Sequence, residues 1–245
     1  MAGSTQDVVV VGGGVAGRSA AIFTARHGLE TAILTSGSPI LRRNAHLENY
    51  PGFPAGVNAR LLLDMMREQT ERAGCAWFDA DVARITKANG GFAIESADGE
   101  TWYSSYVIAA TKNEVSYLDS IDGVGIVDRG KRFVASDDRG RTGVDGLYVA
   151  GRMAQKSHQA IVCAGHGAEV AITLLEDDER PFYHDWVAPS GYFTGRGRDV
   201  PPGCEEINDD ERLRREDESH DTMVSRFSER HPNTPEQHPS VDTSE

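Results

Sequence analysis

The chain has 245 residues, of which 39% are hydrophobic, so it can bury a sizeable core while part of it is expected to stay unfolded. Its formal net charge of −13 argues against nucleic acid and anionic membranes as partners. Much of the acidity lies near the end of the chain, where residues 205–245 hold thirteen acidic residues and five arginines, a net charge of −8.

The chain opens with the pattern of a βαβ unit. The valine-rich run Asp7–Val11 predicts a parallel strand buried on both faces. It leads into a glycine-rich turn, after which residues 19–26 have the pattern of a helix and residues 31–35 that of a second strand. This unit has about the length that a dinucleotide-binding fingerprint requires.

Short strands and longer helices follow. Residues 36–57 have the composition of a long loop, residues 59–72 the pattern of an amphipathic helix, and residues 159–175 that of a later helix. The fold class is therefore α/β: a Rossmann-like domain whose parallel sheet has helices on both faces, plus a small antiparallel β-meander. The further strands are expected at 75–79, 82–87, 91–95, 101–104, 106–111 and 147–151, with an irregular junction at 112–132.

Three parts are expected along the chain. Residues 1–181 form the Rossmann-like nucleotide-binding domain, and residues 182–204, with aromatic side chains among glycines and prolines, form an arm or lid. Residues 205–245 form an acidic, largely disordered tail with at most a short helix near 208–219. The tail has few large apolar side chains, so burial cannot offset the entropy of ordering it.

The cysteines exclude several classes of site. Cys75, Cys163 and Cys204 lie far apart and form no CxxC, so a local dithiol pair, a ribbon-type zinc site and a disulfide framework are excluded, and no metal is expected. No signal peptide precedes the first strand and no apolar run approaches the roughly 18 residues of a membrane span, so a cytoplasmic location is expected. The acidic, lysine-poor composition favours a halophilic host, although a GC-rich genome would also replace lysine with arginine.

The glycine-rich turn carries the first chemical signal. Its GxGxxG pattern, Gly12, Gly14 and Gly17, follows a strand and opens a helix, a context that disfavours an ordinary glycine-rich turn. Glycine lets the backbone approach a pyrophosphate, whose charge the helix N-terminus stabilises. The second strand ends in Thr35 and Ser36 instead of the acid that binds an NAD ribose, so binding of NAD is disfavoured.

Several segments, in order along the chain, carry a family resemblance. Residues 48–53 read ENYPGF and the second strand ends in Thr35, and both features resemble the low-molecular-weight thioredoxin reductase family, which often has threonine at that place. The resemblance covers about residues 6–115 and 133–178. The other matching segments are Ile108–Thr111, which resembles IIATG, residues 138–151, which resemble GRTSVPGVFAAGD, and Gln159-Ala160 with Gly165 and Gly167, which resemble RQA…AAxxG.

The resemblance implies one non-covalent FAD in an extended conformation. The Gly12–Gly17 turn would hold its pyrophosphate, and the helix that begins at Gln159 would point its N-terminal amides at the N1–O2 edge of the flavin. A helix N-terminus stabilises the negative charge that a reduced flavin develops there. The candidate cofactor-binding residues are Gly12, Gly14, Val15, Ala16, Gly17, Thr35, Ser36, Glu48, Asn49, Thr111, Gly151, Arg152, His158, Gln159 and Ala160.

Four departures from the family limit what can be carried over. The interval 112–132 is too short for the NADPH domain that the family inserts there, so that domain and its redox CxxC are expected to be absent. Arg152 replaces the aspartate that binds the ribityl chain, and it either binds the pyrophosphate or caps the strand end. Lys112 replaces the glycine of ATG.

Two side chains near the expected flavin have two readings each. His158, in the place of the family's arginine, either protonates the reduced flavin or is a solvated helix-cap histidine. Cys163 either faces the isoalloxazine or packs as a small hydrophobic residue.

The expected function is that of a thioredoxin reductase-like, FAD-dependent oxidoreductase without dithiol chemistry. Its flavin would exchange electrons with an unidentified small-molecule substrate or redox partner protein, and a homodimer is left open. No catalytic residue is assigned, because the flavin itself would carry the chemistry. The alternative is a non-enzymatic FAD- or nucleotide-binding regulatory module derived from such a flavoprotein, and a binder of NAD is a third reading.

Overall fold

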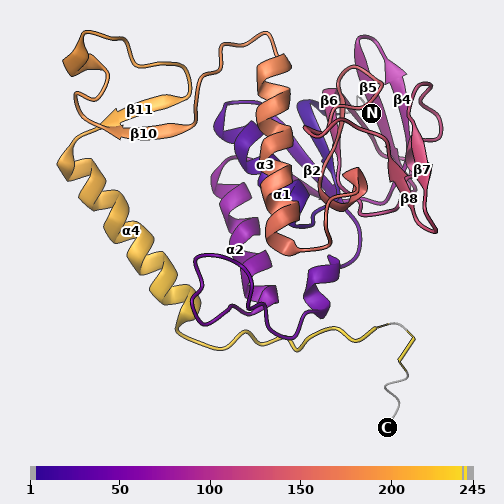
Figure 1. Ribbon diagram of the computed structural model, residues 1–245, viewed down its shortest axis with the longest axis horizontal. Coiled ribbons are helices and arrows are strands. Elements are labelled where there is room, and N and C mark those ends of the chain that lie inside the picture. The colour runs from indigo at the N-terminus through magenta and orange to yellow at the C-terminus, as the bar shows by residue number, and fades with distance from the viewer. Residues whose placement is uncertain (1–3, 239, 242–245) are drawn as a thin grey trace. The chain divides into compact units, whose positions relative to one another are not determined.

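The computed structural model describes residues 4–238, 240 and 241. They divide into two compact units, the first made of the described residues of Met1–Asp177 and Thr234–Glu245, the second of Asp178–Asn233 (Figure 1). This division differs from the expected one, because the second unit joins the arm at 182–204 to most of the tail.

A seven-stranded sheet forms the centre of the first unit. The strand order is β3-β2-β1-β6-β5-β4, and β9 also pairs with β6. β1, β2, β3, β6 and β9 run parallel, whereas β4 and β5 are antiparallel neighbours beside β6. The strands are β1 Ser4–Val11, β2 Thr31–Thr35, β3 Ala76–Asp79, β4 Val82–Ala88, β5 Gly91–Ser96, β6 Thr101–Ala109 and β9 Leu147–Val149.

Two different strands pair with the same edge of β6, one along its first half and one at its end. β5 pairs with the first half of β6, up to Ser104, and β9 pairs with its last three residues, Val107–Ala109. The two strands expected at 101–104 and 106–111 are therefore one strand, whose first half alternates in burial and whose end is fully buried. The strand expected at 75–79 is β3, which joins the parallel sheet beside β2.

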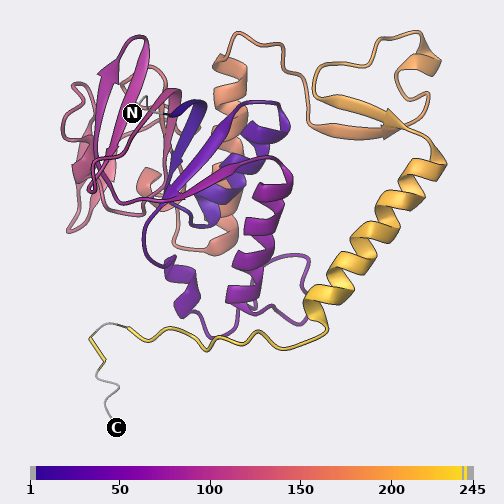
Figure 2. The same cartoon turned by 180° about the vertical axis from the view of Figure 1, so that it is seen from behind.

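The α-helices of the first unit lie side by side on one face of the sheet, where α1 contacts both α2 and α3 (Figures 1 and 2). α1 and α3 approach closely because of Gly167, where a Cβ atom would lie only 2.1 Å from the carbonyl oxygen of Ala16. The expected α/β class and mostly parallel sheet are confirmed. The three helices are α1 Val15–Arg26, α2 Ala59–Arg72 and α3 Ala160–Asp177.

The other face of the sheet is covered by β-structure and short 3-10 helices, whereas the sequence suggested α-helices on both faces. The interval expected to be irregular contains the 3-10 helix η2 (Ser116–Leu118) and the strand β7 (Ile126–Asp128), which pairs with β8 (Arg132–Val134) as a hairpin. The hydrophobic cluster on this face includes Val9, Leu34, Ile85, Phe92, Trp102, Val107, Tyr117, Leu118, Val134 and Met153.

The second unit is built on a pair of parallel strands, β10 Trp186–Pro189 and β11 Cys204–Ile207. The connection between them contains the 3-10 helix η4 (Thr194–Arg196). In this connection, the backbone amides of Gly191, Phe193 and Thr194 donate hydrogen bonds to the carboxylate of Glu206. This pairing explains why the arm and the beginning of the tail form one unit.

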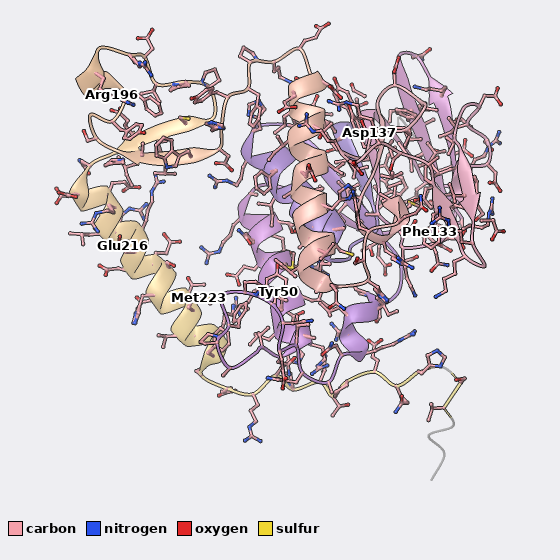
Figure 3. All side chains as sticks on the ribbon, in the orientation of Figure 1. Tyr50, Phe133, Asp137, Arg196, Glu216 and Met223 are labelled. Atoms are coloured by element: carbon pink, nitrogen blue, oxygen red, sulfur yellow. The ribbon has the colours of Figure 1, made fainter. Side chains whose placement is uncertain are left out.

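The helix α4 (Asp209–Phe227) is longer than the short helix expected near 208–219, so that expectation is wrong in length. Asn208 caps it by accepting a hydrogen bond from the Glu211 amide. Arginine and glutamate side chains three or four residues apart then pair along its surface, as at Arg212–Glu216 and Arg214–Glu218. These pairs and the cap stabilise a helix that has no buried residues. Figure 3 labels Glu216 on this helix.

Candidate functional site

Two adjoining pockets lie in the first unit where the central parallel strands end, the edge at which open α/β sheets bind ligands. The strand-end pocket has a volume of about 390 Å³ and is lined by residues that follow β1, β2, β3 and β6. The helix-end pocket has a volume of about 440 Å³ and lies between the beginnings of α1 and α3. The two share Gly14, Val15, Ile40, Leu41, Arg43, Ala110 and Lys112, so they form one continuous space.

The glycine-rich turn forms a cradle for an anion. Gly12 has a φ of +110°, and a Cβ atom there would lie 2.8 Å from the carbonyl oxygen of Ala110. At Gly17 a Cβ atom would lie 2.0 Å from the oxygen of Gly12, so both glycines are required for packing. Gly14 differs, since nothing lies within 4 Å of its Cβ position. It is the N-cap of α1 and lines both pockets, so its missing side chain leaves space beside the helix amides.

The strand-end pocket contains an acidic residue that the sequence analysis did not identify. Thr35 and Ser36 line this pocket, as expected, and Asp81 lines it beside them. The Ser36 hydroxyl donates a hydrogen bond to a carboxylate oxygen of Asp81 over 3.1 Å. The pocket thus holds the acid that is missing after β2, supplied from the turn after β3. A carboxylate and hydroxyls at this place can bind a ribose.

The helix-end pocket brings together residues that lie far apart in the sequence. The Asn49 side-chain amide donates a hydrogen bond to the Gln159 side chain over 2.9 Å. His158 and Ala160 line the pocket at the beginning of α3, opposite Ala16 at the beginning of α1. Two helix N-termini therefore face one pocket, which favours an anionic or electron-rich ligand there.

Cys163 lines the helix-end pocket and is also buried. Its thiol donates to the carbonyl oxygen of Ser157 over 3.4 Å. Burial raises the pKa of this thiol, so the uncharged form is favoured.

Positive charge gathers where the two pockets meet. Lys112 lines both pockets and has a φ of +67°, a left-handed backbone that explains why the family has glycine there. Burial lowers the pKa of Lys112, and the nearby Lys131, Arg43 and Arg152 lower it further. The pKa of His158 is lowered by burial and then by Lys112, Arg152 and Lys131. A ligand that brings negative charge to this place would relieve the repulsion.

Arg152 lies at the edge of the helix-end pocket. Its guanidinium lies over the ring of Phe133, 5.0 Å from the centroid, and donates a hydrogen bond to the carbonyl oxygen of Lys156 over 3.1 Å. It lines the helix-end pocket and does not line the strand-end pocket. The side chain is therefore held at the edge of the site by packing.

Most of the candidate residues meet in the two pockets, and three do not line them. Gly17 is buried inside α1, and Glu48 is exposed. Gly151 is buried behind Arg152, where its N–H donates to His166 Nδ1 over 3.0 Å. The other candidates line one pocket or both: Gly12, Gly14, Val15, Ala16, Thr35, Ser36, Asn49, Thr111, Arg152, His158, Gln159 and Ala160.

The sequence analysis missed the loop wall of the site. The segment around the 3-10 helix η1 (Ile40–Arg43) lines both pockets, and Arg60 holds it by donating to the carbonyl oxygens of Arg42 and Asn44. Composition alone predicted only a loop here. The lining residues that were not among the candidates are Val11, Gly13, Leu34, Ser38, Pro39, Ile40, Leu41, Arg43, Asn44, Leu47, Ala80, Asp81, Val82, Ala110, Lys112, Glu114, Tyr117 and Cys163.

Among the described residues, none of the helices has the length and apolar character needed to cross a bilayer. Across the same residues, histidine, cysteine and acidic side chains do not gather in threes that could hold a metal ion.

Comparisons with known proteins agree with the geometry of the pockets. The family profile described as "FAD binding domain" matches residues 7–47, which include β1, the glycine turn, α1 and β2. The bifunctional thioredoxin reductase/thioredoxin of Mycobacterium leprae is 33% identical over 134 residues, 54% of this chain and 29% of that protein. The thioredoxin reductase of Rickettsia felis is 26% identical over 178 residues, 72% of this chain and 57% of that protein. The chain thus spans well under two thirds of these relatives.

Solved structures show the same fold. The thioredoxin reductase of T. acidophilum matches with a TM-score of 0.62 at 20% identity, covering 71% of this chain and 98% of that one. That of Gloeobacter violaceus matches with a TM-score of 0.61 at 17% identity, covering 74% and 99%. These solved structures show the fold, and the profile match and the relatives indicate FAD as the cofactor. The non-enzymatic alternative gains no support from them.

Proposed function

We propose that this protein is an FAD-dependent oxidoreductase whose flavin exchanges electrons with a substrate or partner outside this chain. The observation that carries the proposal is the continuous space at the strand ends, entered by the N-termini of both α1 and α3. When bound, FAD supplies the electron transfer. The protein's residues then bind the cofactor, orient it and set the charge around it.

Each part of the site has a role in this proposal. The open space at Gly14 and the first amides of α1 receive the pyrophosphate, with Lys112 and Arg43 neutralising its charge. Ser36 and Asp81 hold the ribose of the adenosine end. This assignment leaves the helix-end pocket for the isoalloxazine ring system of the flavin.

At the helix-end pocket, the hydrogen bond between Asn49 and Gln159 fixes the wall against which a ring would lie. The amides at the beginning of α3 stabilise negative charge in this pocket. His158, whose pKa is lowered mainly by burial, is neutral near pH 7 and so can accept a proton there.

The proposal places the electron donor or acceptor outside the chain for two reasons. The sequence has no CxxC, so a local dithiol cannot accept electrons from the flavin. The chain between β6 and β9 contains η2 and the short hairpin of β7 and β8, and a nucleotide-binding βαβ unit is not formed by these described residues.

The visible spectrum of the purified protein tests the proposal directly. After incubation with FAD and gel filtration, the protein should keep a flavin spectrum that bleaches with dithionite and returns in air. Gly14→Leu should abolish flavin binding, because the side chain fills the pyrophosphate space. Gly165→Leu is the matched control, since that Cβ position is also open but lies outside both pockets.

The outcomes separate the functions considered. A wild type that stays colourless after incubation with FAD contradicts the proposal. A protein that binds flavin but never reoxidises it with any small-molecule acceptor supports the regulatory module. A Gly14→Leu variant that folds and keeps a full complement of FAD would show that the cofactor binds elsewhere.

A further inference from the structure

A third pocket, here called the basic pocket, adjoins the candidate flavin site. It has a volume of about 390 Å³ and lies between the β7–β8 hairpin and the 3-10 helix η3 (Gly151–Ala154). Figure 3 labels Phe133, which forms one wall. All its side chains are positive or neutral: it is lined by Arg129, Gly130, Lys131, Phe133, Arg152 and Gln155.

Among the described residues, the cations that line the basic pocket form no ion pairs, whereas arginines close to them in sequence do. Arg132, Arg139 and Arg141 lie close in sequence, and each forms an ion pair, with Asp119, Glu176 and Asp177 respectively. Within the part of the chain that the structure describes, Arg129 and Lys131 form no ion pair.

The nearest acid of the hairpin does not neutralise the pocket. Asp128 accepts a hydrogen bond from the Gly130 amide and does not line the space. Three cations left together in a chain with a net charge of −13 indicate a place for an external anion.

The basic pocket is electrostatically connected to the flavin site. Arg152 lines both the basic pocket and the helix-end pocket. Lys131 lowers the pKa values of Lys112 and His158, which line the helix-end pocket, so these charges lie within effective range of one another. An anion held by Lys131 would therefore lie beside the ring end of the site and would reduce the repulsion there.

We propose that the basic pocket binds the oxyanion, phosphate or carboxylate, of a small-molecule electron donor or acceptor whose reactive end enters the helix-end pocket past Arg152. The inference rests on the proposed flavin function. Two guanidinium groups and an ammonium suit an oxyanion, because arginine donates two parallel hydrogen bonds to it. The volume of the pocket lies within the range of small-ligand sites, which favours a small molecule over an acidic protein.

Titration calorimetry on the FAD-loaded protein tests the proposal, because FAD then occupies its own pyrophosphate site. The probes are inorganic pyrophosphate for phosphate ligands, citrate for carboxylate ligands, and poly-glutamate for an acidic protein. Wild type should bind pyrophosphate or citrate at low salt and lose affinity as salt rises. Lys131→Ala and Arg129→Ala should each weaken that binding about tenfold, since each removes one charge-assisted contact.

Controls keep the test independent of folding and of the flavin. Lys131 and Arg129 are exposed on a hairpin and line neither flavin pocket, so both variants should keep wild-type flavin absorbance. Arg84→Ala, an exposed arginine of β4 that donates to Ser120, should bind the probes as wild type does.

Failure of this inference can be told apart from failure of the proposed function. A colourless wild type would overturn the flavin proposal. The difference in probe affinity between wild type and the Lys131→Ala and Arg129→Ala variants would still report on the basic pocket, because neither residue lines the flavin pockets. Unchanged probe affinity in both Lys131→Ala and Arg129→Ala would overturn the inference. Binding of poly-glutamate without binding of either small probe would overturn it in favour of an acidic protein partner. Preference between pyrophosphate and citrate identifies the oxyanion.

Discussion

The hydroxyl of Ser36 donates a hydrogen bond to the carboxylate of Asp81 over 3.1 Å, although 45 positions separate the two residues. Ser36 follows β2 and Asp81 follows β3, and these strands are parallel neighbours in which Thr35 lies opposite Asp79. Their carboxyl ends therefore meet at the strand-end pocket. In the proposed site, the adjacent strand thus supplies the acid that ribose sites usually take from the end of the second strand.

Asp81→Ala should weaken FAD binding about fivefold, which corresponds to the loss of about 1 kcal/mol from one hydrogen bond to the ribose. Fluorescence titration with FAD measures the affinity, and AMP as competitor isolates the adenosine end. Asp79→Ala is the matched control, because Asp79 is also exposed near the end of β3 but lines neither pocket. Equal affinities in wild type and Asp81→Ala would remove Asp81 from the site.

Elements that are specified by their own residues and immediate neighbours could be predicted from the sequence. The helix α2 was predicted with both ends correct, at Ala59 and Arg72, because an amphipathic pattern begins directly after the capping residue Asn58. β2 was likewise predicted at Thr31–Thr35, because a buried strand lies between polar residues. The position of the glycine turn was predicted, since a strand and a helix flank it.

Features that depend on long-range pairing were not predictable in this way. β3 pairs with β2, which lies some forty residues earlier in the chain, so local sequence does not predict this pairing. The sequence of β3 by itself equally suits a strand of an antiparallel meander. The same is true of Asp81, whose role arises only when β2 and β3 pair. The length of α4 depends on ion pairs between its side chains. The low content of apolar residues in this segment instead suggested disorder.

The stability of the first unit should depend on pH through His166. This buried imidazole accepts a hydrogen bond from the Gly151 N–H at Nδ1, and its Nε2 lies 3.2 Å from the carbonyl oxygen of Asp138. Burial, and then Lys156, lower its pKa below the ordinary 6.5. The unfolded chain therefore takes up a proton that the folded unit resists, so the free energy of unfolding should fall as pH drops below about 6.5.

Urea denaturation between pH 5 and pH 8 measures this slope. His166→Asn keeps a hydrogen-bond acceptor without titrating, so its unfolding free energy should vary less with pH. His158, whose pKa is also lowered, contributes to the remaining slope. His220→Asn, at an exposed position of α4, should retain the full wild-type slope. An identical pH profile for wild type and His166→Asn would refute the assignment.

Glu206 should make the second unit sensitive to acid. Although desolvation raises its pKa, hydrogen bonds from Thr194, Phe193 and Gly191 outweigh that effect and bring the pKa to about 2. Since the unfolded value is 4.5, the stabilisation is complete above pH 4.5 and is lost as pH falls toward 2. Hydrogen exchange at these three amides should accelerate in Glu206→Gln, relative to the control Glu216→Gln on α4. Unchanged protection would contradict the role of the carboxylate.

Lys112 should show opposite effects on stability and on cofactor affinity. Its left-handed backbone, with φ of +67°, costs an L-residue with a side chain roughly 1–2 kcal/mol, which glycine does not incur. Lys112→Gly should therefore raise the free energy of unfolding by about 1 kcal/mol after the greater chain entropy of glycine is included. It should also weaken FAD binding, most at low salt, because the ammonium lies where both pockets meet and its Coulomb attraction is then least screened.

Asn89→Gly is the matched control, since Asn89 also has a positive φ, +43°, but lines neither of these pockets. That variant should leave FAD affinity unchanged at every salt concentration. Urea denaturation of the apo-protein and FAD titration at two salt concentrations measure the two effects separately. A Lys112→Gly variant that gains stability with no loss of affinity would mean that the strained lysine does not serve the cofactor.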